Sequence, residues 1–389
     1  MSKTKRKLRP CDDKPKVGLV LTGGGARAAY QVGVLRAIAE MLPEDADNPF
    51  PVICGTSAGA INAASLAVAA NEFQEGVRQL EDVWANFHVG QVYRADLMGV
   101  LKNSFKFLIS LFSSDYGRHR AISLLDNSPL QSLLLRRVPL KMLHHCIRSG
   151  SLHALGITAW GYTSGQSVTF YQAARGIIPW KRAQRVGVST QIGVQHLMAS
   201  SAIPFFFPPI KLNREFFGDG SMRQMTPISP ALHLGSDKVL IIGVHREYDE
   251  LPKRVSATSY PSFAQIAGHA MNSIFVDSLD VDLERLQRIN ETLKLIPLQT
   301  RQENKMRLRP VDSMIISPSI EINEIAQSYA QSLPITMRSL YRAVGAMSPN
   351  GSTLLSYVLF EAPFCKALIE LGRNDTLQQK DKVLQFIST

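Results

Sequence analysis

The stretch that decides the fold is TGGGARAAYQVGVL at residues 22–35, together with the apolar run KVGLVLT at 16–22 that leads into it. A short apolar run that ends at glycines is typical of a strand buried on both faces. Residues 26–41 then carry the pattern of a helix. The three glycines between them have three readings: a phosphate-binding loop, a dinucleotide fingerprint, or a set of backbone donors for an oxyanion.

A second unit of the same kind follows at once. FPVICG at 50–55 predicts another short strand, and SAGAINAASLAVAA at 57–70 predicts an alanine-rich helix. Two successive βα units predict a parallel sheet with right-handed crossovers. Downstream we expect helices over most of 72–150, a hairpin at 154–172 around Ser164-Gly165, a helix ending before Pro204, strands at 237–246 and 313–319, and mainly helices from about 260.

Composition places the chain among globular proteins. Of its 389 residues, 45% are hydrophobic and 19% charged, and the formal net charge is +11. Part of that charge lies in MSKTKRKLRP at the start, which reads as a solvated basic leader or as a segment attracted to anionic phospholipid surfaces. No nucleic-acid recognition motif accompanies it, so we expect no nucleic-acid partner.

Targeting signals and cysteine spacing indicate the cellular compartment in which the protein is expected. The sequence shows no apolar core of a secretory signal, and no apolar window long enough for a membrane-spanning helix. Its four cysteines are far apart and have no metal-binding spacing. We therefore expect a cytoplasmic, disulfide-free protein without a bound metal, with peripheral attachment to the inner face of the membrane as the alternative.

The residues around the glycine run argue against both a dinucleotide-binding and a phosphate-binding loop. Gly23, Gly25 and Ala28 formally satisfy the G-x-G-x-x-G/A pattern, but the second strand ends in CGT at 54–56 instead of the acidic residue that would hold a ribose. No Gly-Lys-Ser/Thr follows, which excludes a Walker loop. We expect no cofactor.

The second strand instead leads into GTSAG at 55–59, which matches the G-x-S-x-G nucleophile elbow in the strand–turn–helix context that this motif requires. Gly55 and Gly59 leave room for a sharp turn that strains the serine backbone. The hydroxyl of Ser57 then projects at the N-terminus of a helix, where the helix dipole favours developing negative charge. Ser57 is the candidate nucleophile.

The two glycine-containing loops follow neighbouring parallel strands, so they are expected side by side at one edge of the sheet. Backbone N–H groups of Gly23, Gly24, Gly25 and Ala26 can then point at a carbonyl attacked by the serine. The glycine run therefore predicts an oxyanion hole, whose donors contribute a few kcal/mol to lowering the barrier.

The base that activates the serine has two candidate arrangements. A Ser–Asp–His triad would pair Ser57 with Asp219 and one of His233, His245 or His269. The α/β-hydrolase order that this implies places several strands before the nucleophile, whereas only two precede this serine. The alternative is a Ser–Asp dyad.

The dyad candidate lies in FFGDGSM at 216–222, where Asp219-Gly220 forms a tight turn after two phenylalanines. An ordinary aspartate, with a pKa of about 3.9, is a weak base towards a serine hydroxyl. Desolvation beside Phe216 and Phe217 would raise that pKa and make the carboxylate a better base.

LVLTGGGARAAYQVGVLRA, GTSAGAINA and DGS together resemble the patatin-like phospholipase family, over roughly residues 16–245. Members are similar to cytosolic phospholipase A2 and use a Ser–Asp dyad with a glycine-rich oxyanion loop. The resemblance implies Ser57 as nucleophile, Asp219 as base, and Arg27 with the three glycines as the oxyanion block. Two positions depart from the family pattern: Ala28 replaces its usual glycine, and Ser221 replaces the small residue after Asp-Gly.

The resemblance also implies a three-layer α/β/α fold with a mainly parallel sheet and the activity of a serine acyl hydrolase, a phospholipase A or lipid esterase, acting on a lipid or membrane-surface substrate. An acyl thioesterase with the same dyad and a catalytically silent lipid-binding or scaffold protein are the alternatives. The expected organisation is a disordered basic leader at 1–15, a catalytic domain at 16–250 with a lid-like helical insertion at about 90–150, and a mainly helical extension at 251–389 packed on that domain.

Three further segments have open readings. Arg27 either binds an anionic group of the substrate or supports its loop electrostatically. LMGVLKNSFKFLISLF at 97–112 is amphipathic and is either a core helix or a lid that docks on lipid. FFFPP at 205–209 either lines an acyl-chain channel or belongs to the core.

Overall fold

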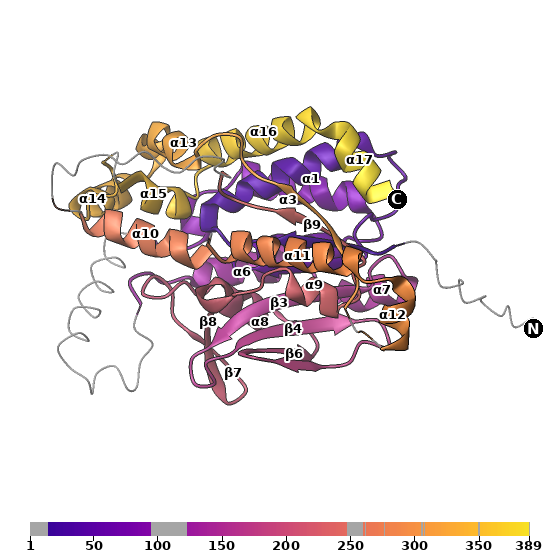
Figure 1. Cartoon of the computed structure of the whole chain (residues 1–389). Helices are drawn as coiled ribbons and strands as arrows, with labels where there is room; N and C mark the ends of the chain where they lie inside the picture. Colours follow the sequence, from indigo (N-terminus) through magenta and orange to yellow (C-terminus); the bar gives the residue numbers. More distant parts are fainter. Residues whose placement is uncertain are drawn as a thin grey trace, which may run out of the picture.

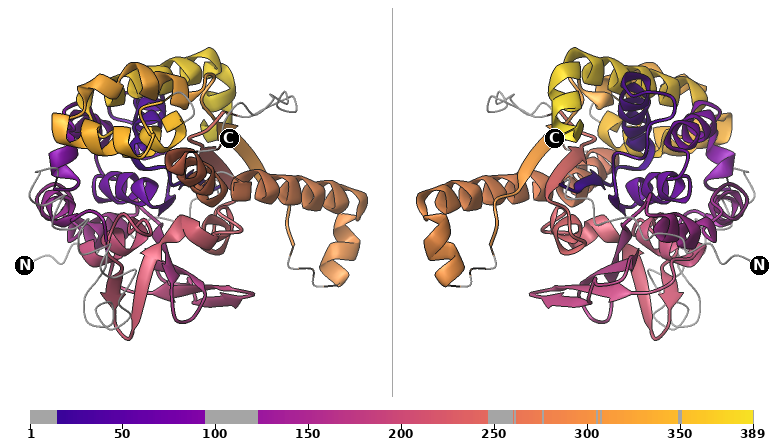
Figure 2. Two further views of the ribbon diagram at one scale, coloured as in Figure 1. Left: turned by 90° about the vertical axis from the view of Figure 1, so that its left-hand side faces the viewer. Right: turned by 90° about the vertical axis from the view of Figure 1, so that its right-hand side faces the viewer.

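The computed structural model describes residues 15–94, 123–246, 260, 262–275, 277–304, 306, 308–348 and 351–388. The expected basic leader, apart from residue 15, and the amphipathic segment 97–112 lie outside these residues. The described chain forms one central sheet with helices on both faces (Figures 1 and 2). This confirms the mixed α/β fold with a mostly parallel sheet.

Within the described residues, ten strands form the sheet, with the order β10-β9-β1-β2-β3-β4-β6-β5 and a short hairpin of β7 and β8 attached to β3. Strands β10, β9, β1, β2 and β3 are parallel, and β3 pairs antiparallel with both β4 and β8. The strands are β1 Val17–Leu21, β2 Val52–Thr56, β3 Ala154–Gly161, β4 Ser167–Ala173, β5 Trp180–Arg182, β6 Arg185–Ser189, β7 Ile210–Leu212, β8 Glu215–Asp219, β9 Lys238–Ile242 and β10 Asp312–Ile316.

The helices are α1 Ala29–Met41, α2 Ala58–Val68, α3 Phe73–Ala85, α6 Ser128–Arg137, α7 Met142–Ser149, α8 Val194–Ser200, α9 Ser229–His233, α10 Phe263–Phe275, α11 Asp277–Leu295, α12 Leu298–Glu303, α13 Ile322–Ser328, α14 Ile335–Ala343, α15 Ser352–Val358, α16 Ala362–Gln378 and α17 Lys380–Ser388, with 3-10 turns η1 Gly25–Ala28, η2 Val89–Gln91, η3 Gly220–Arg223 and η4 Ala330–Ser332. Among the described helices, none is long and apolar enough to cross a membrane.

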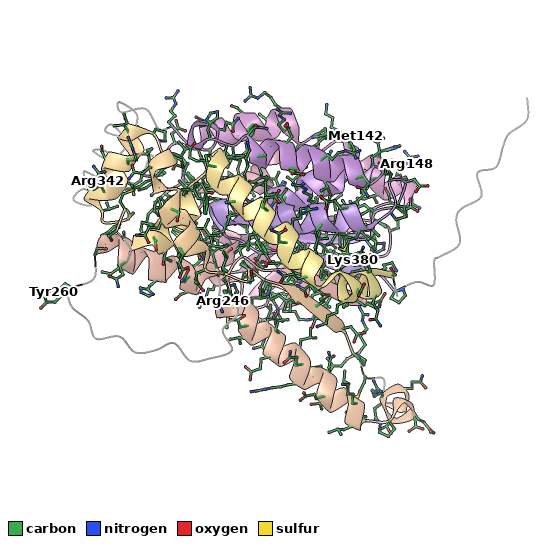
Figure 3. All side chains as sticks on the ribbon, turned by 90° about the horizontal axis from the view of Figure 1, so that it is seen from above. Met142, Arg148, Arg246, Tyr260, Arg342 and Lys380 are labelled. Atoms are coloured by element: carbon green, nitrogen blue, oxygen red, sulfur yellow. The ribbon has the colours of Figure 1, made fainter. Side chains whose placement is uncertain are left out.

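Successive side chains along a strand point to opposite faces of the sheet, so each face has its own apolar core. On β1, Leu19 and Leu21 pack into the large core beneath α1, α2, α3 and α16, whereas Val20 faces the smaller core beneath α9 and α11. Every residue of β1 is buried, as expected for a strand covered on both faces. Seen from above, α16 runs alongside α1, and α11 extends away from the body towards α12 (Figure 3).

The expected elements are largely present, with shifted ends. The helix expected over 26–41 begins as the 3-10 turn η1, and the regular helix α1 starts only at Ala29. The expected hairpin at 154–172 is β3 and β4, and the strand expected at 313–319 is β10. The α-helix expected before Pro204 is confined to α8.

The chain beyond residue 250 is part of this same architecture. Strand β10 pairs with β9 and so extends the central sheet by one strand. Helix α16 packs closely on α1, because a Cβ atom at Gly33 would lie 1.9 Å from the carbonyl oxygen of Ile369, and one at Gly372 would lie 2.2 Å from that of Tyr30. Glycine at both positions lets the two backbones approach each other.

We expect Gly33→Ala to destabilise the protein. Alanine gains about 1 kcal/mol of helix propensity, but overpacking against a backbone oxygen costs about 1–3 kcal/mol or more, and the backbone of α16 cannot yield cheaply. The urea midpoint of unfolding should therefore fall. Gly193→Ala is the control, because its added methyl would have its nearest neighbour at 3.9 Å. Equal midpoints for Gly33→Ala and the wild type would contradict the close packing.

Candidate active site

The glycine run and the elbow meet at one edge of the sheet. The first follows β1 and the second follows β2, and these parallel neighbours are in register, with Leu21 opposite Gly55. Ligands of open α/β sheets bind at the carboxyl ends of the strands, which is where both loops lie.

The elbow has the strained backbone that the motif predicts. Ser57 has φ 56° and ψ −129°, in a region where a residue other than glycine costs on the order of 1–3 kcal/mol. The flanking glycines are required by close approach: a Cβ at Gly59 would lie 2.4 Å from the carbonyl oxygen of Leu21, and one at Gly55 would lie 2.3 Å from that of Gly59. Only glycine fits at either position.

The structure brings Ser57 and Asp219 together. The serine hydroxyl donates a 2.6 Å hydrogen bond to Oδ2 of the aspartate, and the two residues are 1% and 0% exposed. The other carboxylate oxygen, Oδ1, accepts the backbone N–H of Ser221 at 2.9 Å. Gly220 lies against the neighbouring strand, because a Cβ there would be 2.1 Å from the carbonyl oxygen of Thr158.

Burial changes the acidity of this carboxyl group. It raises the pKa of Asp219 to about 6, and the hydrogen bonds from Ser57 and Ser221 oppose that increase. Of the two aromatic neighbours expected from sequence, Phe217 is buried and Phe216 is 48% exposed. The carboxylate is therefore a stronger base than an exposed aspartate and is ionised above about pH 6.

Ser200 also fixes the position of the elbow, and the sequence analysis does not predict this residue. Its hydroxyl accepts the backbone N–H of Ser57 at 2.9 Å and donates to the carbonyl oxygen of Thr158 at 2.6 Å. Ser200 lies in MASSAIP at 198–204, but nothing in that segment indicates which of its serines turns towards the elbow.

The glycine run forms the wall next to the serine. Gly25 has φ +55° and lines the same cavity as Ser57. Within η1 the first bond runs from the N–H of Arg27 to the carbonyl oxygen of Gly24, so the turn itself leaves the N–H groups of Gly25 and Ala26 unbonded. Both residues stand at the start of the turn, and Gly25 lines the cavity together with Ser57.

Gly23, in contrast, lies away from that cavity. A Cβ there would meet the hydroxyl of Ser221 at 2.3 Å and the ring of Phe275 at 2.8 Å. A Cβ at Gly24 would meet Val244 at 2.6 Å. These two glycines are thus needed to let the loop lie close to its neighbours.

Arg27 points into the C-terminal segment and is 3% exposed. Its Nε donates to the hydroxyl of Ser356 at 2.8 Å, and its Nη2 donates to Oδ1 of Asn323 at 2.7 Å. The guanidinium lies 3.9 Å from the ring centroid of Tyr357, which in turn stacks on Phe275. Of the two readings of Arg27, these contacts favour support of the loop. Its partners lie about 300 residues away, so no local sequence signal identifies them.

The three histidines of the alternative triad lie elsewhere. His233 stacks on Trp180, with ring centroids 4.7 Å apart, and burial, reinforced by two nearby arginine charges, lowers its pKa to about 4. His245 lies 3.5 Å from a carboxylate oxygen of Asp280. In the described ranges no hydrogen bond joins these histidines, or His269 on α10, to the serine–aspartate pair.

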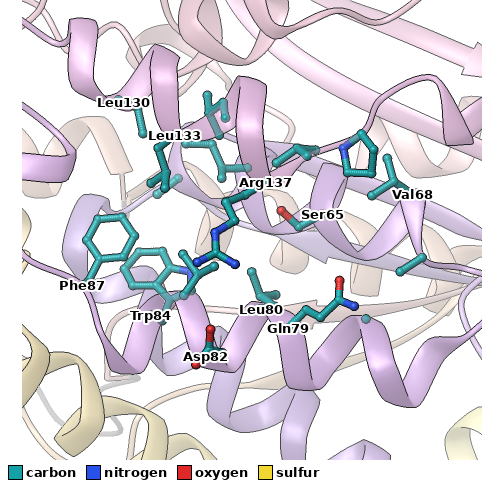
Figure 4. Close-up of a pocket in the computed structure, with 18 of the residues that line it drawn as sticks. Ser65, Val68, Gln79, Leu80, Asp82, Trp84, Phe87, Leu130, Leu133 and Arg137 are labelled. Atoms are coloured by element: carbon teal, nitrogen blue, oxygen red, sulfur yellow. The ribbon is translucent and has the colours of Figure 1, made fainter.

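A cavity of about 810 Å³ opens from Ser57 along α2, which presents Ala58, Ile61, Ser65 and Val68 to it at helical spacing. Its other walls come from α3, α6 and α7, which contribute apolar residues such as Trp84 and Leu133 and charged ones such as Asp82 and Arg137. Phe207 of the FFFPP segment also lines it. Figure 4 shows Ser65 directed into this space, and the side chain of Arg137 reaching across it from α6.

Comparison with known proteins gives one family match. The model described as patatin-like phospholipase matches residues 19–232, more than half of the chain. A 51-residue stretch is 53% identical to lysophospholipase nte1 of Aspergillus terreus (strain NIH 2624 / FGSC A1156); it covers 13% of this chain and 3% of that protein. Among solved structures, VipD from Legionella pneumophila is 12% identical with a TM-score of 0.38, over 95% of this chain and 67% of that one.

We expect Asp219→Asn to make stability less dependent on pH. The folded pKa of about 6 lies above the ordinary value, so the folded state binds more protons than the unfolded state between roughly pH 4 and 6, and this carboxyl costs stability as pH rises through that window. At pH 8 the cost in the wild type is on the order of 2–3 kcal/mol. Urea unfolding of the wild type and Asp219→Asn at pH 4.5 and 8 measures this difference in the free energy of unfolding.

The variant should gain stability relative to the wild type at pH 8 and lose most of that gain at pH 4.5. A difference in the free energy of unfolding that is the same at both pH values would show that the Asp219 carboxyl is not raised in pKa by burial.

Proposed function

Because the chain belongs to the patatin-like phospholipase family, a family of lipid acyl hydrolases, we propose that it is a serine acyl hydrolase whose nucleophile is Ser57 and whose general base is Asp219. The observation that carries this proposal is the 2.6 Å hydrogen bond between the two side chains, at the end of an 810 Å³ cavity. The proposed substrates are fatty-acyl esters of phospholipids.

In the first half of the reaction, Oγ of Ser57 attacks the ester carbonyl carbon while its proton passes to Oδ2 of Asp219. The carbonyl oxygen becomes an oxyanion and accepts the N–H groups of Gly25 and Ala26, with Gly23 and Gly24 shaping the loop that presents them. The C–O bond to the leaving alcohol then breaks, and the alcohol takes the proton from Asp219. A lysolipid leaves and an acyl-enzyme remains.

In the second half, water replaces the alcohol. Asp219 accepts a proton as water attacks the acyl carbonyl, the oxyanion forms again in the same place, and Oγ of Ser57 leaves and recovers the proton. The free fatty acid is released. The strained backbone of Ser57 keeps its hydroxyl at the end of the cavity in both halves.

The apolar wall of the cavity indicates which part of the substrate enters it. The face of α2 from Ala58 to Val68 is about 15 Å long at 1.5 Å per residue. Each methylene removed from water into such a space stabilises binding by about 0.8 kcal/mol, so the cavity favours a long acyl chain over a short one. An acyl thioester would place its chain in the same cavity, and the two substrates differ only in the group that leaves.

Hydrolysis of mixed phospholipid vesicles by wild type, Ser57→Ala and Asp219→Asn tests the dyad, with released lipids identified by mass spectrometry. The wild type should release fatty acid and lysolipid, and each variant should lose at least about 1,000-fold of the rate, as expected for loss of a nucleophile or its base. Because Asp219 must be ionised, the wild-type kcat/KM should rise with pH to a plateau, with a midpoint near 6.

Activity that survives in Asp219→Asn but not in Ser57→Ala would assign the base to another residue. If no form hydrolyses phospholipid, the same three proteins are compared on long-chain acyl thioesters and labelled with a fluorophosphonate. Labelling of the wild type and not of Ser57→Ala supports serine chemistry on a different ester, and no labelling contradicts an enzymatic role for this serine.

Ser65→Leu tests the placement of the acyl chain. The larger side chain projects into the middle of the cavity, so kcat/KM for a 16-carbon ester should fall by about tenfold or more relative to a 4-carbon ester. Ser132→Leu, on the exposed side of α6, is the matched control and should leave that ratio unchanged. An unchanged ratio in both variants would place the acyl chain outside this cavity.

A further inference from the structure

A second cavity lies on the other face of the sheet, beside α9 and α11. Its volume is about 270 Å³, just below the range of about 300–1,000 Å³ that is usual for small-molecule pockets. The residues that line it include Ser167 and Thr169 of β4, Arg185 of β6, Arg223 at the end of η3, and Arg285 of α11. None of these residues contacts the proposed substrate site.

The register of the sheet explains why three of them meet. Ser167 pairs with Arg185 across β4 and β6, and Thr169 pairs with Gly187, so these side chains share one face of the sheet. The intervening Val168 packs into a separate apolar cluster on the opposite face. Polar side chains therefore form the floor of the cavity, and the arginines of η3 and α11 lie around it.

The positive charge of this cavity is not balanced by salt bridges. Within the described part of the chain, Arg185, Arg223 and Arg285 form no salt bridge with a carboxylate. Nη1 of Arg185 contacts the hydroxyl of Thr226, whereas its Nε is buried and has no hydrogen-bond partner. A buried, unbonded guanidinium N–H is costly, and Arg185, which carries it, lines the cavity.

The charged groups that act on Arg185 are Asp282 and Arg285 of α11 and Arg182 of β5. Burial lowers the pKa of Arg185; Asp282 on α11 opposes that decrease, and Arg285 and Arg182 add to it. Asp282 is itself buried, at 7% exposed, and accepts the backbone N–H of Ile228 at 3.1 Å. Asp282 interacts electrostatically with Arg185 and Arg285, and no carboxylate is among the residues that line the cavity, whereas three arginines are. The lining of the cavity is therefore net positive.

We infer that this cavity binds a phosphate group. Guanidinium groups bind phosphate through paired, charge-assisted hydrogen bonds, and three arginines from different elements line this one cavity, which suits a tetrahedral anion with several acceptor oxygens. The guanidinium of Arg223 also lies over the ring of Trp160, 5.4 Å from its centroid. Hydroxyl groups of Thr226 and Ser229 line the same cavity and supply further donors. The group belongs either to a small soluble phosphomonoester or to a phospholipid headgroup.

The site is close to the serine–aspartate pair in the chain. The turn η3 is capped by Asp219, which precedes it, and ends at Arg223. The next residue, Gln224, lines the cavity and accepts a 2.7 Å hydrogen bond from the hydroxyl of Thr56, beside Ser57. Phosphate bound here would contact the segment that leaves the proposed base.

Calorimetric titration with inorganic phosphate and with glycerol 3-phosphate, at constant ionic strength, tests the inference. The Ser57→Ala protein is used, so that the result is independent of hydrolysis. Arg223→Gln and Arg285→Gln remove exposed members of the cavity wall, and each should weaken binding by about tenfold or more. Arg288→Gln is the matched control: it is also exposed, lies one turn along α11 and pairs with Glu284 outside the cavity.

Co-sedimentation with phosphatidylcholine vesicles, with and without phosphatidic acid, separates the two sources of phosphate. If the protein binds the soluble probes and Arg285→Gln weakens that binding, the ligand is a soluble phosphate compound. If the protein binds only vesicles that contain phosphatidic acid and Arg285→Gln weakens that binding, the ligand is a phospholipid headgroup. The inference is overturned if the parent protein binds neither, or if Arg288→Gln weakens binding as much as Arg285→Gln, which would show nonspecific attraction.

Discussion

The buried hydrogen bond from Ser57 to Asp219 joins residues 162 positions apart, and much of the fold serves to align them. The serine is placed by β2, and the aspartate is placed by β8, which reaches the site by pairing antiparallel with β3. Since β3 also pairs with β2, one strand sets the separation of the two side chains. The bond depends on sheet register, and Ser200 on α8 adds a second link between the elbow and β3.

This arrangement places several unfavourable features in one location. Ser57 has a strained backbone, and Asp219 is a buried carboxylate. Each costs stability, and the dense apolar packing of the helices on both faces of the sheet offsets that cost. Strain and perturbed pKa values concentrate where chemistry requires them, so their coincidence here supports the proposed role of the pair.

The segment beyond the matched family region contributes directly to the site. It supplies Tyr357, Ser356 and Asn323 to Arg27, and it closes over the glycine run through Phe275. Arg27 directly precedes the N-terminus of α1, where a cation is unfavourable, and the stack on Tyr357 with two hydrogen bonds compensates for that position. The expected C-terminal extension is thus structurally continuous with the loop that we propose as the oxyanion hole.

The sequence by itself determined the βα units, the parallel sheet and the candidate loops, because each rests on local features: apolar runs, glycines at sharp turns and a serine in an elbow motif. Only the tertiary structure decided which groups meet: that Asp219 and none of the three histidines bonds to Ser57, that Ser200 holds the elbow, and that Arg27 turns towards the C-terminal helices. The physical reason is that backbone propensity acts over a few residues, whereas burial, hydrogen bonding and charge depend on strand register and helix packing between segments distant in the chain.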